Sequence, residues 1–211
     1  MPGVVDMLRE LDPPAEAVRE RLSALAQRLQ TKDGDTGDHT TAVSKLAVAI
    51  ACEMGVADDQ LRHIELGALL HDVGKLAVPD RILKKPSPLT ELEWVAMRRH
   101  AASGERLLVS IVDLPDVLSV VRSHHERWDG SGYPDGLRTE EIPLGARIVA
   151  VADAFEAMIE SRAYRPARSR AESFAEIIRH AGTQFDPACA DALRRVLELQ
   201  ERAGDDADDA K

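Results

Sequence analysis

Apolar residues recur at helical spacing along most of the chain, and the alternating runs typical of β-strands are nearly absent. One apolar stripe consists of Val43, Leu46, Ala47, Ile50 and Met54, which lie on one face of a helix because they recur every three or four residues. The pattern predicts roughly seven to nine helices in an all-α, single-domain fold. With 211 residues, 44% of them hydrophobic, the chain can bury one sizeable core.

The predicted helices follow one another with polar or proline-rich breaks between them. They cover about residues 15–30, 39–54, 59–72, 90–110, 115–126 and 143–162, with two more between 169 and 202. Thr90 and Glu93 match a capping box, which favours a helix start there, and segment 78–89 with its three prolines is predicted to be a connector.

Three regions are expected along the chain. Residues 1–34 form an N-terminal helical segment, residues 35–203 form the main domain, and residues 204–211 form an acidic tail that is expected to be disordered because of its composition.

Charge and composition narrow the classes of function. A formal net charge of −10 argues against general binding to a nucleic acid polymer. A small anionic substrate is not excluded, because bound metal ions can reverse the local field. No run of about 18 apolar residues predicts a membrane span, and the N-terminus lacks the features of a signal peptide. The isolated Cys52 and Cys189 fit a reducing cytoplasm.

One acidic residue lies in an otherwise apolar helix. Asp153 is the only polar side chain between Ile148 and Phe155, and an unpaired carboxylate buried there would cost several kcal/mol. It therefore needs a cation or a dense set of hydrogen-bond donors. A salt bridge to an arginine would satisfy this need, and so would a metal ion.

Two pairs of potential ligands stand at the ends of predicted helices. His71 and Asp72 end one apolar helix, and His124 and His125 lie where another helix gives way to a glycine-rich loop. Neighbouring residues on a regular helix do not face the same site. At a helix end the backbone relaxes, so both members of a pair can turn toward a common centre.

Two further histidines, His39 and His100, lie on inward faces of predicted helices. Each alone is more often a core residue than a ligand. Together, five histidines and two aspartates on or beside buried faces indicate a centre with more than one metal ion. Such ligands without thiolate suit iron, manganese or zinc. A carboxylate such as Asp72 can bridge two ions, and a bridging hydroxide can attack a phosphorus atom.

The segment HHERWDGSGYP, which begins at His124, resembles the signature of the HD-GYP family, a branch of the HD phosphohydrolases. The resemblance extends from Asp35 to about Ala192 and includes TGDH, HDVGK, ILKKPSPLT, RRHAASGERLL, ARIVAVADAFEAM and SRAYRPA in family order. It implies an HD-type helical bundle with a GYP loop. It also implies a metal-dependent phosphodiesterase that hydrolyses cyclic di-GMP to pGpG, and in many members of the family on to GMP.

The resemblance also implies roles for individual residues. The metal ligands would be His39, His71, Asp72, His100, His124, His125 and Asp153. Lys75 would stabilise charge near the attacking hydroxide or a phosphate oxygen. Asp35 stands where some members use a glutamate for a third ion, which leaves two or three ions open. Iron and manganese are the expected metals, with zinc, nickel and magnesium as alternatives.

Further implied roles concern substrate and partners. Arg162 and Arg165 would hold a phosphate, although a solvated helix end would also explain them. Gly132, Tyr133 and Pro134 of the GYP loop would contact a partner such as a GGDEF-type cyclase, and a homodimer is compatible with the family.

Glu126 is interpreted either as a residue that orients a ligand histidine or as an ordinary surface glutamate.

Two rival functions stay open from the sequence. The chain could sense cyclic di-GMP, or act as an adaptor, with little turnover, although an adaptor has no need of seven ligands. It could also hydrolyse another nucleotide. About 30 residues precede the site, which is too few for a separate sensory domain. Control through expression, oligomerisation, partners or the N-terminal helix is therefore expected, unless the chain is a fragment of a longer protein.

Overall fold

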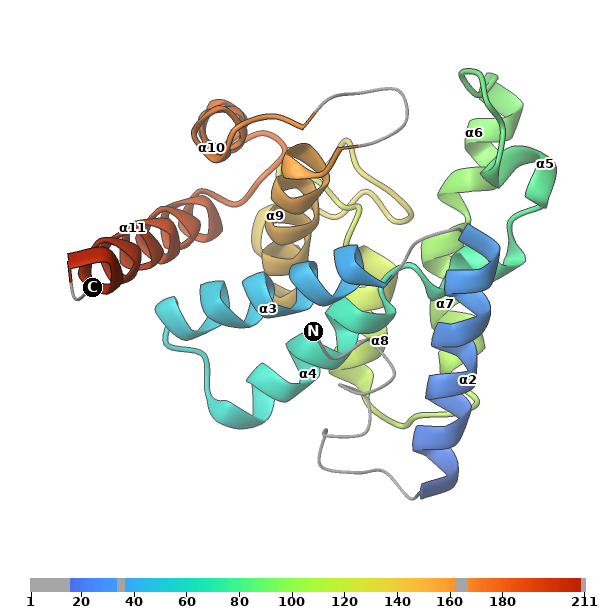
Figure 1. Ribbon diagram of the computed structural model, residues 1–211. Coiled ribbons are helices and arrows are strands. Elements are labelled where there is room, and N and C mark those ends of the chain that lie inside the picture. The colour runs from blue at the N-terminus through green and yellow to red at the C-terminus, as the bar shows by residue number, and fades with distance from the viewer. Residues whose placement is uncertain (1–15, 34–36, 162–166, 210–211) are drawn as a thin grey trace.

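The computed structural model describes residues 16–33, 37–161 and 167–209, and over these residues the chain is helical, without strands (Figure 1). The helices are α2 (Glu16–Asp33), α3 (Asp38–Glu53), α4 (Asp58–Leu70), α5 (Asp80–Leu83), α6 (Glu91–Arg98), α7 (His100–Leu108), α8 (Pro115–Ser123), α9 (Leu144–Ile159), α10 (Arg170–Arg179) and α11 (Pro187–Asp209), with the 3-10 helices η1 (Val73–Ala77) and η2 (Thr139–Glu141). The predicted all-α fold is confirmed.

The structure differs from the predicted elements at three places. The connector contains the short helix α5. The single helix predicted to follow Thr90 is divided at Arg99 into α6 and α7, although its capping box is present as predicted. The acidic tail was predicted to be disordered, but α11 continues to Asp209. The helix can continue because the tail has no proline and only one glycine, Gly204.

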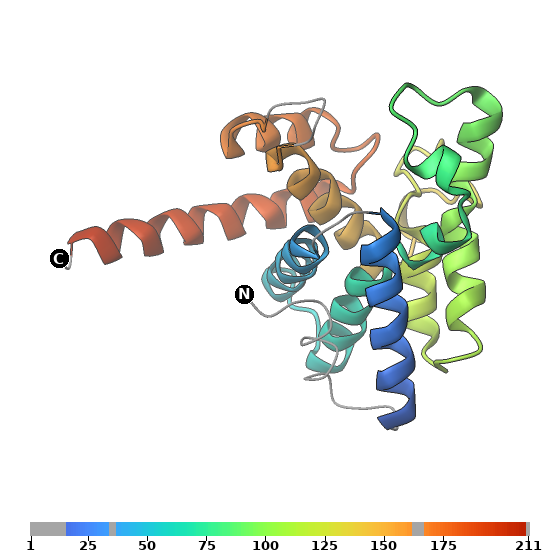
Figure 2. The ribbon, with the colours of Figure 1, turned by 45° about the vertical axis from the view of Figure 1, so that its right-hand side comes forward.

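Two hydrophobic cores lie side by side in the bundle. The first core is built mainly by α3, α9 and α11, with fully buried residues such as Ile50, Phe155 and Leu193. The second core is built mainly by α2, α4, α7 and α8 and includes Leu22 and Leu70. In Figure 2, α11 extends away from the bundle on the side opposite α7.

Helices α4 and α8 contribute to both cores. Ala68 of α4 and Val120 of α8 pack in the first core, whereas Leu69 and Val121, one position further along each helix, pack in the second. Residues at the ends of α4 and α8 therefore lie at the junction of the two cores.

A pair of glycines brings η1 directly against α7. A Cβ atom at Gly74 would lie 1.8 Å from the carbonyl oxygen of His100 and 2.5 Å from the amide nitrogen of Gly104. No side chain fits into that space. The residues just before Gly74 are thus held beside the start of α7.

No helix among the described residues is long and apolar enough to cross a membrane.

Candidate metal centre

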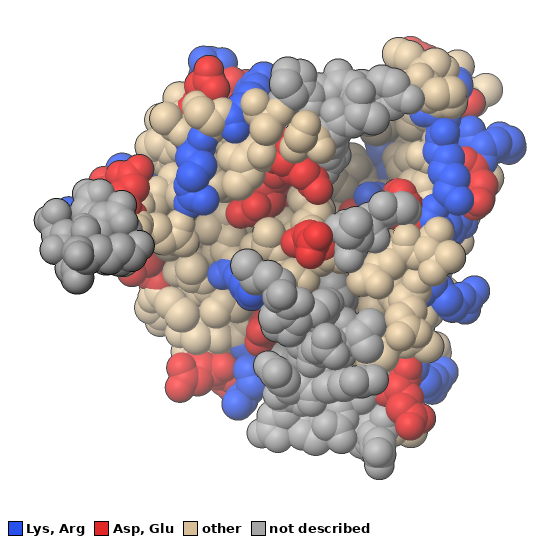
Figure 3. Space-filling view, in the orientation of Figure 1, with Lys and Arg blue, Asp and Glu red and all other residues tan. Residues whose placement is uncertain are grey.

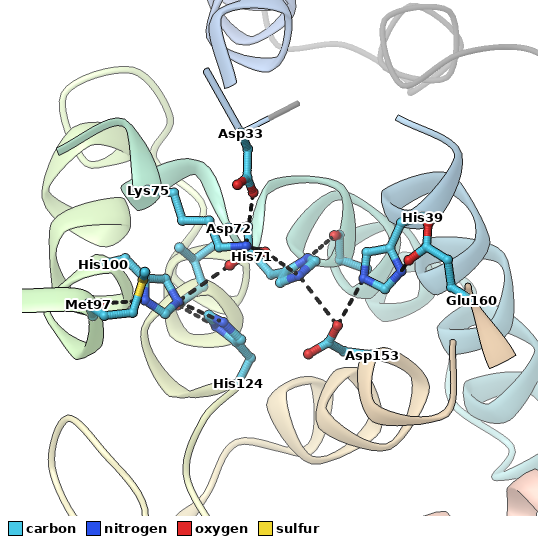
Figure 4. Close-up of polar contacts among 12 residues, drawn as sticks. Asp33, His39, His71, Asp72, Lys75, Met97, His100, His124, Asp153 and Glu160 are labelled. Atoms are coloured by element: carbon cyan, nitrogen blue, oxygen red, sulfur yellow. Dashed lines mark hydrogen bonds and ion pairs between the residues drawn. The ribbon is translucent and has the colours of Figure 1, made fainter. Parts of the chain in front are cut away.

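The candidate ligands come from five separate elements and meet at the junction of the two cores (Figure 4). They lie at the start of α3, the end of α4, the start of α7, the end of α8 and the middle of α9. All seven predicted ligands fall within the described residues. Their placement together agrees with the sequence analysis, whereas their role as metal ligands stays a prediction.

One group of potential ligand atoms gathers on the α7 and α8 side of the site. The nitrogen or oxygen atoms offered by Asp72, His100, His124 and His125 all lie within 4.8 Å of one another. Nε2 of His100 is 3.4 Å from Oδ1 of Asp72 and 3.4 Å from Nε2 of His124. This spacing lets one divalent cation contact several of the atoms at once.

A second group lies on the α3 and α9 side. Oδ1 of Asp153 is 3.1 Å from Nε2 of His39 and 4.0 Å from Nε2 of His71. The other oxygen of the shared carboxylate, Oδ2 of Asp72, is 3.3 Å from Nε2 of His71. Asp72 therefore directs one oxygen to each group, as a carboxylate that bridges two ions would. Within the part of the chain that the structure describes, Asp153 pairs with His39 and His71 and not with an arginine.

Backbone carbonyls orient three of the imidazoles. Each Nδ1 lies within hydrogen-bond distance of the carbonyl oxygen three residues earlier: His71 with Ala68 at 2.7 Å, His100 with Met97 at 2.7 Å and His124 with Val121 at 2.9 Å. Because a carbonyl oxygen only accepts, Nδ1 must carry a proton, so in the neutral imidazole Nε2 is left with a lone pair facing the centre.

A buried nitrogen atom without a hydrogen-bond partner supports the binding of a cation at this site. Nε2 of His71 is buried and has no hydrogen-bond partner among the described residues, and such atoms are rare in proteins. A divalent cation that displaces the proton of His71 would bind this nitrogen. The imidazole and carboxylate donors are also the types that iron, manganese and zinc accept, so the residues present fit a metal centre.

The electrostatics of the histidines differ across the site. Burial, together with the nearby His100, lowers the pKa of His125 to about 4. Burial and the neighbouring histidines hold the pKa of His124 well below its ordinary value. Burial would also lower the pKa of His71, but attraction to Asp72 and Asp153 outweighs it and raises the pKa of His71 to about 9. Neutral imidazoles, the form that binds metals, therefore predominate on the α8 side.

A lysine stands beside the shared carboxylate. Nζ of Lys75 is 2.6 Å from Oδ2 of Asp72 and 3.0 Å from Oδ2 of Asp33 at the end of α2. Burial would lower the pKa of Lys75, but the two carboxylates hold it above its ordinary value, so the group stays an ammonium. Asp33 was not predicted from the sequence, because nothing distinguishes it from the other acids in the polar segment 31–38.

A cleft of about 780 Å³ opens over these residues. His39, Asp72, Lys75, His100, His125 and Asp153 line its floor, and Asp33, Leu83, Trp94, Met97, Tyr133, Ala157 and Glu160 complete its wall. In Figure 3 a hollow lies between the acidic side chains that gather over α9 and the part of the molecule that contains α5 and α6. The volume suits a ligand of nucleotide size.

The GYP loop closes one side of the cleft. The Tyr133 ring lies on His125, with centroids 4.8 Å apart. Glu126 is buried, and its Oε1 accepts hydrogen bonds from the amides of Asp135 (2.7 Å) and Gly136 (3.1 Å). Both interpretations of Glu126 are therefore wrong: it holds the loop rather than a ligand histidine, and it is not a surface residue. This role depends on how the loop folds back, which the local sequence does not reveal.

Three predicted site residues, Asp35, Arg162 and Arg165, lie outside the described residues.

Comparison with known proteins agrees with the architecture. The model of the HD domain family matches residues 13–189. The cyclic di-GMP phosphodiesterase response regulator RpfG from Xanthomonas campestris is 42% identical over 193 residues, which cover 90% of this chain and 50% of the relative. The 3'3'-cGAMP-specific phosphodiesterase 3 from Vibrio cholerae is 35% identical over 178 residues, covering 84% of this chain and 39% of the relative. This chain thus spans half or less of the length of these relatives.

A solved structure, of an HDG"Y"P protein from Bdellovibrio bacteriovorus, superposes with a TM-score of 0.66 at 21% identity, over 92% of this chain and 69% of that one. At this identity the likeness supports the fold alone. The match of the family model over most of the chain and the complete HHERWDGSGYP signature lead to one conclusion: the chain belongs to the HD domain family, in its HD-GYP branch.

Proposed function

We propose that this protein is a metal-dependent cyclic di-GMP phosphodiesterase whose product is pGpG or, after a second hydrolysis, GMP. The observation that carries the proposal is Asp72, whose two oxygens face two groups of potential metal ligands at the floor of a nucleotide-sized cleft. The names of the relatives support a cyclic dinucleotide as substrate.

Two ions are proposed because the ligand atoms form two groups that share Asp72, and iron or manganese suits these donors. The ions would be held by His39, His71, Asp72, His100, His124, His125 and Asp153. When bound, divalent ions supply Lewis acidity and lower the pKa of water. A third ion would need Asp35.

The protein's own cations would bind the phosphates. Lys75 presents an ammonium at the floor of the cleft, where it would donate to a phosphate oxygen and offset developing negative charge. Arg162 and Arg165 would hold the phosphate bidentately.

A second candidate substrate is 3'3'-cGAMP, because one relative of similar coverage is named for it. The two substrates share the phosphodiester that the centre would cleave and differ in one base. A sensor or adaptor that binds cyclic di-GMP without turnover is the remaining alternative.

Location and partners are part of the same proposal. We propose a cytoplasmic location, which the free thiols of Cys52 and Cys189 support. A GGDEF-type cyclase on the GYP loop (Gly132, Tyr133 and Pro134) and a homodimer stay predictions from the family resemblance.

The test begins with anaerobic purification and metal analysis, followed by hydrolysis assays with iron, manganese or no added metal. Cyclic di-GMP, 3'3'-cGAMP and cyclic di-AMP are compared by chromatography of the products. Two or more ions per chain and the appearance of pGpG or GMP support the proposal. A metal-loaded protein that leaves cyclic di-GMP intact contradicts it, and a binding titration then separates a sensor from a hydrolase of another substrate.

A further inference from the structure

The wall of the cleft contains an aromatic residue that the metal centre does not use. Trp94 of α6 lines the cleft, and 47% of its surface is exposed. None of the residues of α6 is buried, so packing in a core does not explain an indole at this position. Its ring faces the same space as the floor residues, which indicates contact with whatever occupies the cleft.

Trp94 lies on the same side of its helix as residues that approach the candidate metal centre. Trp94, Met97 and His100 follow one another at intervals of three residues, which places them on one side of the α6–α7 segment, and all three line the cleft. In Figure 4, Met97 lies directly beside His100. Leu92, on the same helix and 84% exposed, does not line the cleft. Exposure is thus general on α6, and what distinguishes Trp94 from Leu92 is its position on the cleft.

The guanidinium of Arg98 lies near both the Trp94 indole and the Tyr133 ring. The Cζ atom of Arg98 lies 6.0 Å from the centroid of Trp94 and 5.5 Å from that of Tyr133, and Tyr133 in turn lies on His125. Flat aromatic and guanidinium groups thus follow one another from the candidate ligand His125, through Tyr133 and Arg98, to Trp94. Such surfaces are what exposed nucleobases stack on.

We propose that Trp94 is the stacking platform for one purine base of the substrate and that Arg98 donates hydrogen bonds to that base. The proposal rests on the proposed function, because it needs a cyclic dinucleotide whose phosphate reaches the metal centre. A base is one sugar away from its phosphate, and Trp94 lines the same cleft as the candidate metal ligands. Guanine suits Arg98, since its O6 and N7 both accept, whereas adenine offers a donor at N6.

The first experiment separates binding from chemistry in the metal-loaded protein. Trp94→Ala should raise the KM for cyclic di-GMP about tenfold or more, with kcat within about threefold of wild type and the metal content unchanged. Trp94→Phe, which keeps a flat ring, should recover most of the loss. Leu92→Ala, on the same helix but away from the cleft, is the matched control and should leave the KM unchanged. An unchanged KM in Trp94→Ala overturns the proposal.

The second experiment reads the base directly. The chain has two tryptophans, and Trp128 does not line the cleft, so Trp128→Phe leaves Trp94 as the sole indole. Rapid mixing with cyclic di-GMP should quench its fluorescence before turnover, whereas ribose 5-phosphate, which lacks a base, should not. Quenching without hydrolysis would contradict the proposed function and leave the stacking role standing. Hydrolysis without quenching would do the reverse.

The preference for guanine is tested with Arg98→Ala. The ratio of kcat/KM for cyclic di-GMP to that for cyclic di-AMP should fall about tenfold. Arg99→Ala, the adjacent exposed arginine on another side of the helix, should keep the wild-type ratio. An unchanged ratio in Arg98→Ala removes Arg98 from base recognition.

Discussion

The imidazoles of the candidate centre are oriented by backbone oxygens rather than by other side chains. His71, His100 and His124 each point Nδ1 to the carbonyl three residues earlier. Any residue supplies such a carbonyl, so the orientation depends on local helix geometry and not on the identity of the neighbour. Substitution of the residues at the i−3 positions should therefore matter less than substitution of the histidines themselves.

His71 offers the sharpest test among the candidate ligands. His71→Ala removes the buried Nε2 that has no hydrogen-bond partner among the described residues, so we expect metal content to fall and kcat to drop below about one hundredth of wild type. Elemental analysis and product chromatography measure the two effects. His63→Ala is the control, because His63 pairs with Asp116 away from the centre. Full metal content and activity in His71→Ala would contradict the assignment.

The raised pKa of His71 predicts the direction in which stability and metal affinity change with pH. The attraction of Asp72 raises its pKa from 6.5 to about 9 against the effect of burial, so the stabilisation from this ion pair is present below pH 6.5 and is lost as the pH rises through about 9. A metal ion binds only the neutral imidazole, so its binding must displace this proton. Metal affinity should therefore rise with pH up to about 9.

Calorimetry can count the displaced proton. Titration of manganese into the apoprotein at pH 7.5, in buffers of different ionisation enthalpy, should show release of about one proton per chain. The buried His124 and His125, whose pKa values are lowered, should add little. Metal binding without proton release would show that His71 is neutral beforehand.

At the scale of secondary structure, the sequence predicted those features that depend on residues close together in the chain. The Thr90–Glu93 capping box predicted the start of α6 and is present. The break between α6 and α7 at Arg99 was not predicted, because no proline or glycine stands beside it in the sequence. The loop contact of Glu126 joins residues nine and ten positions apart, and the position of Asp33 beside Lys75 depends on how α2 packs. Residue types and predicted helix ends thus indicated the site. Contacts between separate elements could not be predicted, because they depend on how the helices and loops pack.

The contact between η1 and α7 can be tested through Gly74. Gly74→Ala would place a Cβ 1.8 Å from the carbonyl oxygen of His100, so η1 and α7 must separate. We expect a loss of about 3 kcal/mol in the free energy of unfolding and lower metal content, because Asp72 moves away from His100. Denaturant unfolding and elemental analysis measure these effects. Gly55→Ala is the control: its φ of 72° makes alanine strained, but nothing lies within 4 Å. It should lose about 1–2 kcal/mol and keep its metal.

At the scale of the whole molecule, the candidate centre joins the two hydrophobic cores. His39 and Asp153 come from α3 and α9, which build the first core, whereas His100 comes from α7 of the second. Asp72 lies between them, just after α4, which contributes to both. A cation held by ligands from both sides would bind the folded arrangement and not the unfolded chain, so metal occupancy should stabilise the whole domain.

Thermal unfolding tests this link. At metal concentrations about 100-fold above the Kd, the folded state gains about 2.7 kcal/mol, and for a domain of this size that should raise the Tm by roughly 5–10 °C. Chelation should remove the shift. His39→Ala deletes a ligand from the first-core side, so its metal-induced shift should be smaller, while His63→Ala should retain the full shift. If the Tm of the wild-type protein is the same with manganese and with chelator, the metal does not connect the two cores. An equal shift in His39→Ala would instead mean that the ions bind on the α7 and α8 side alone.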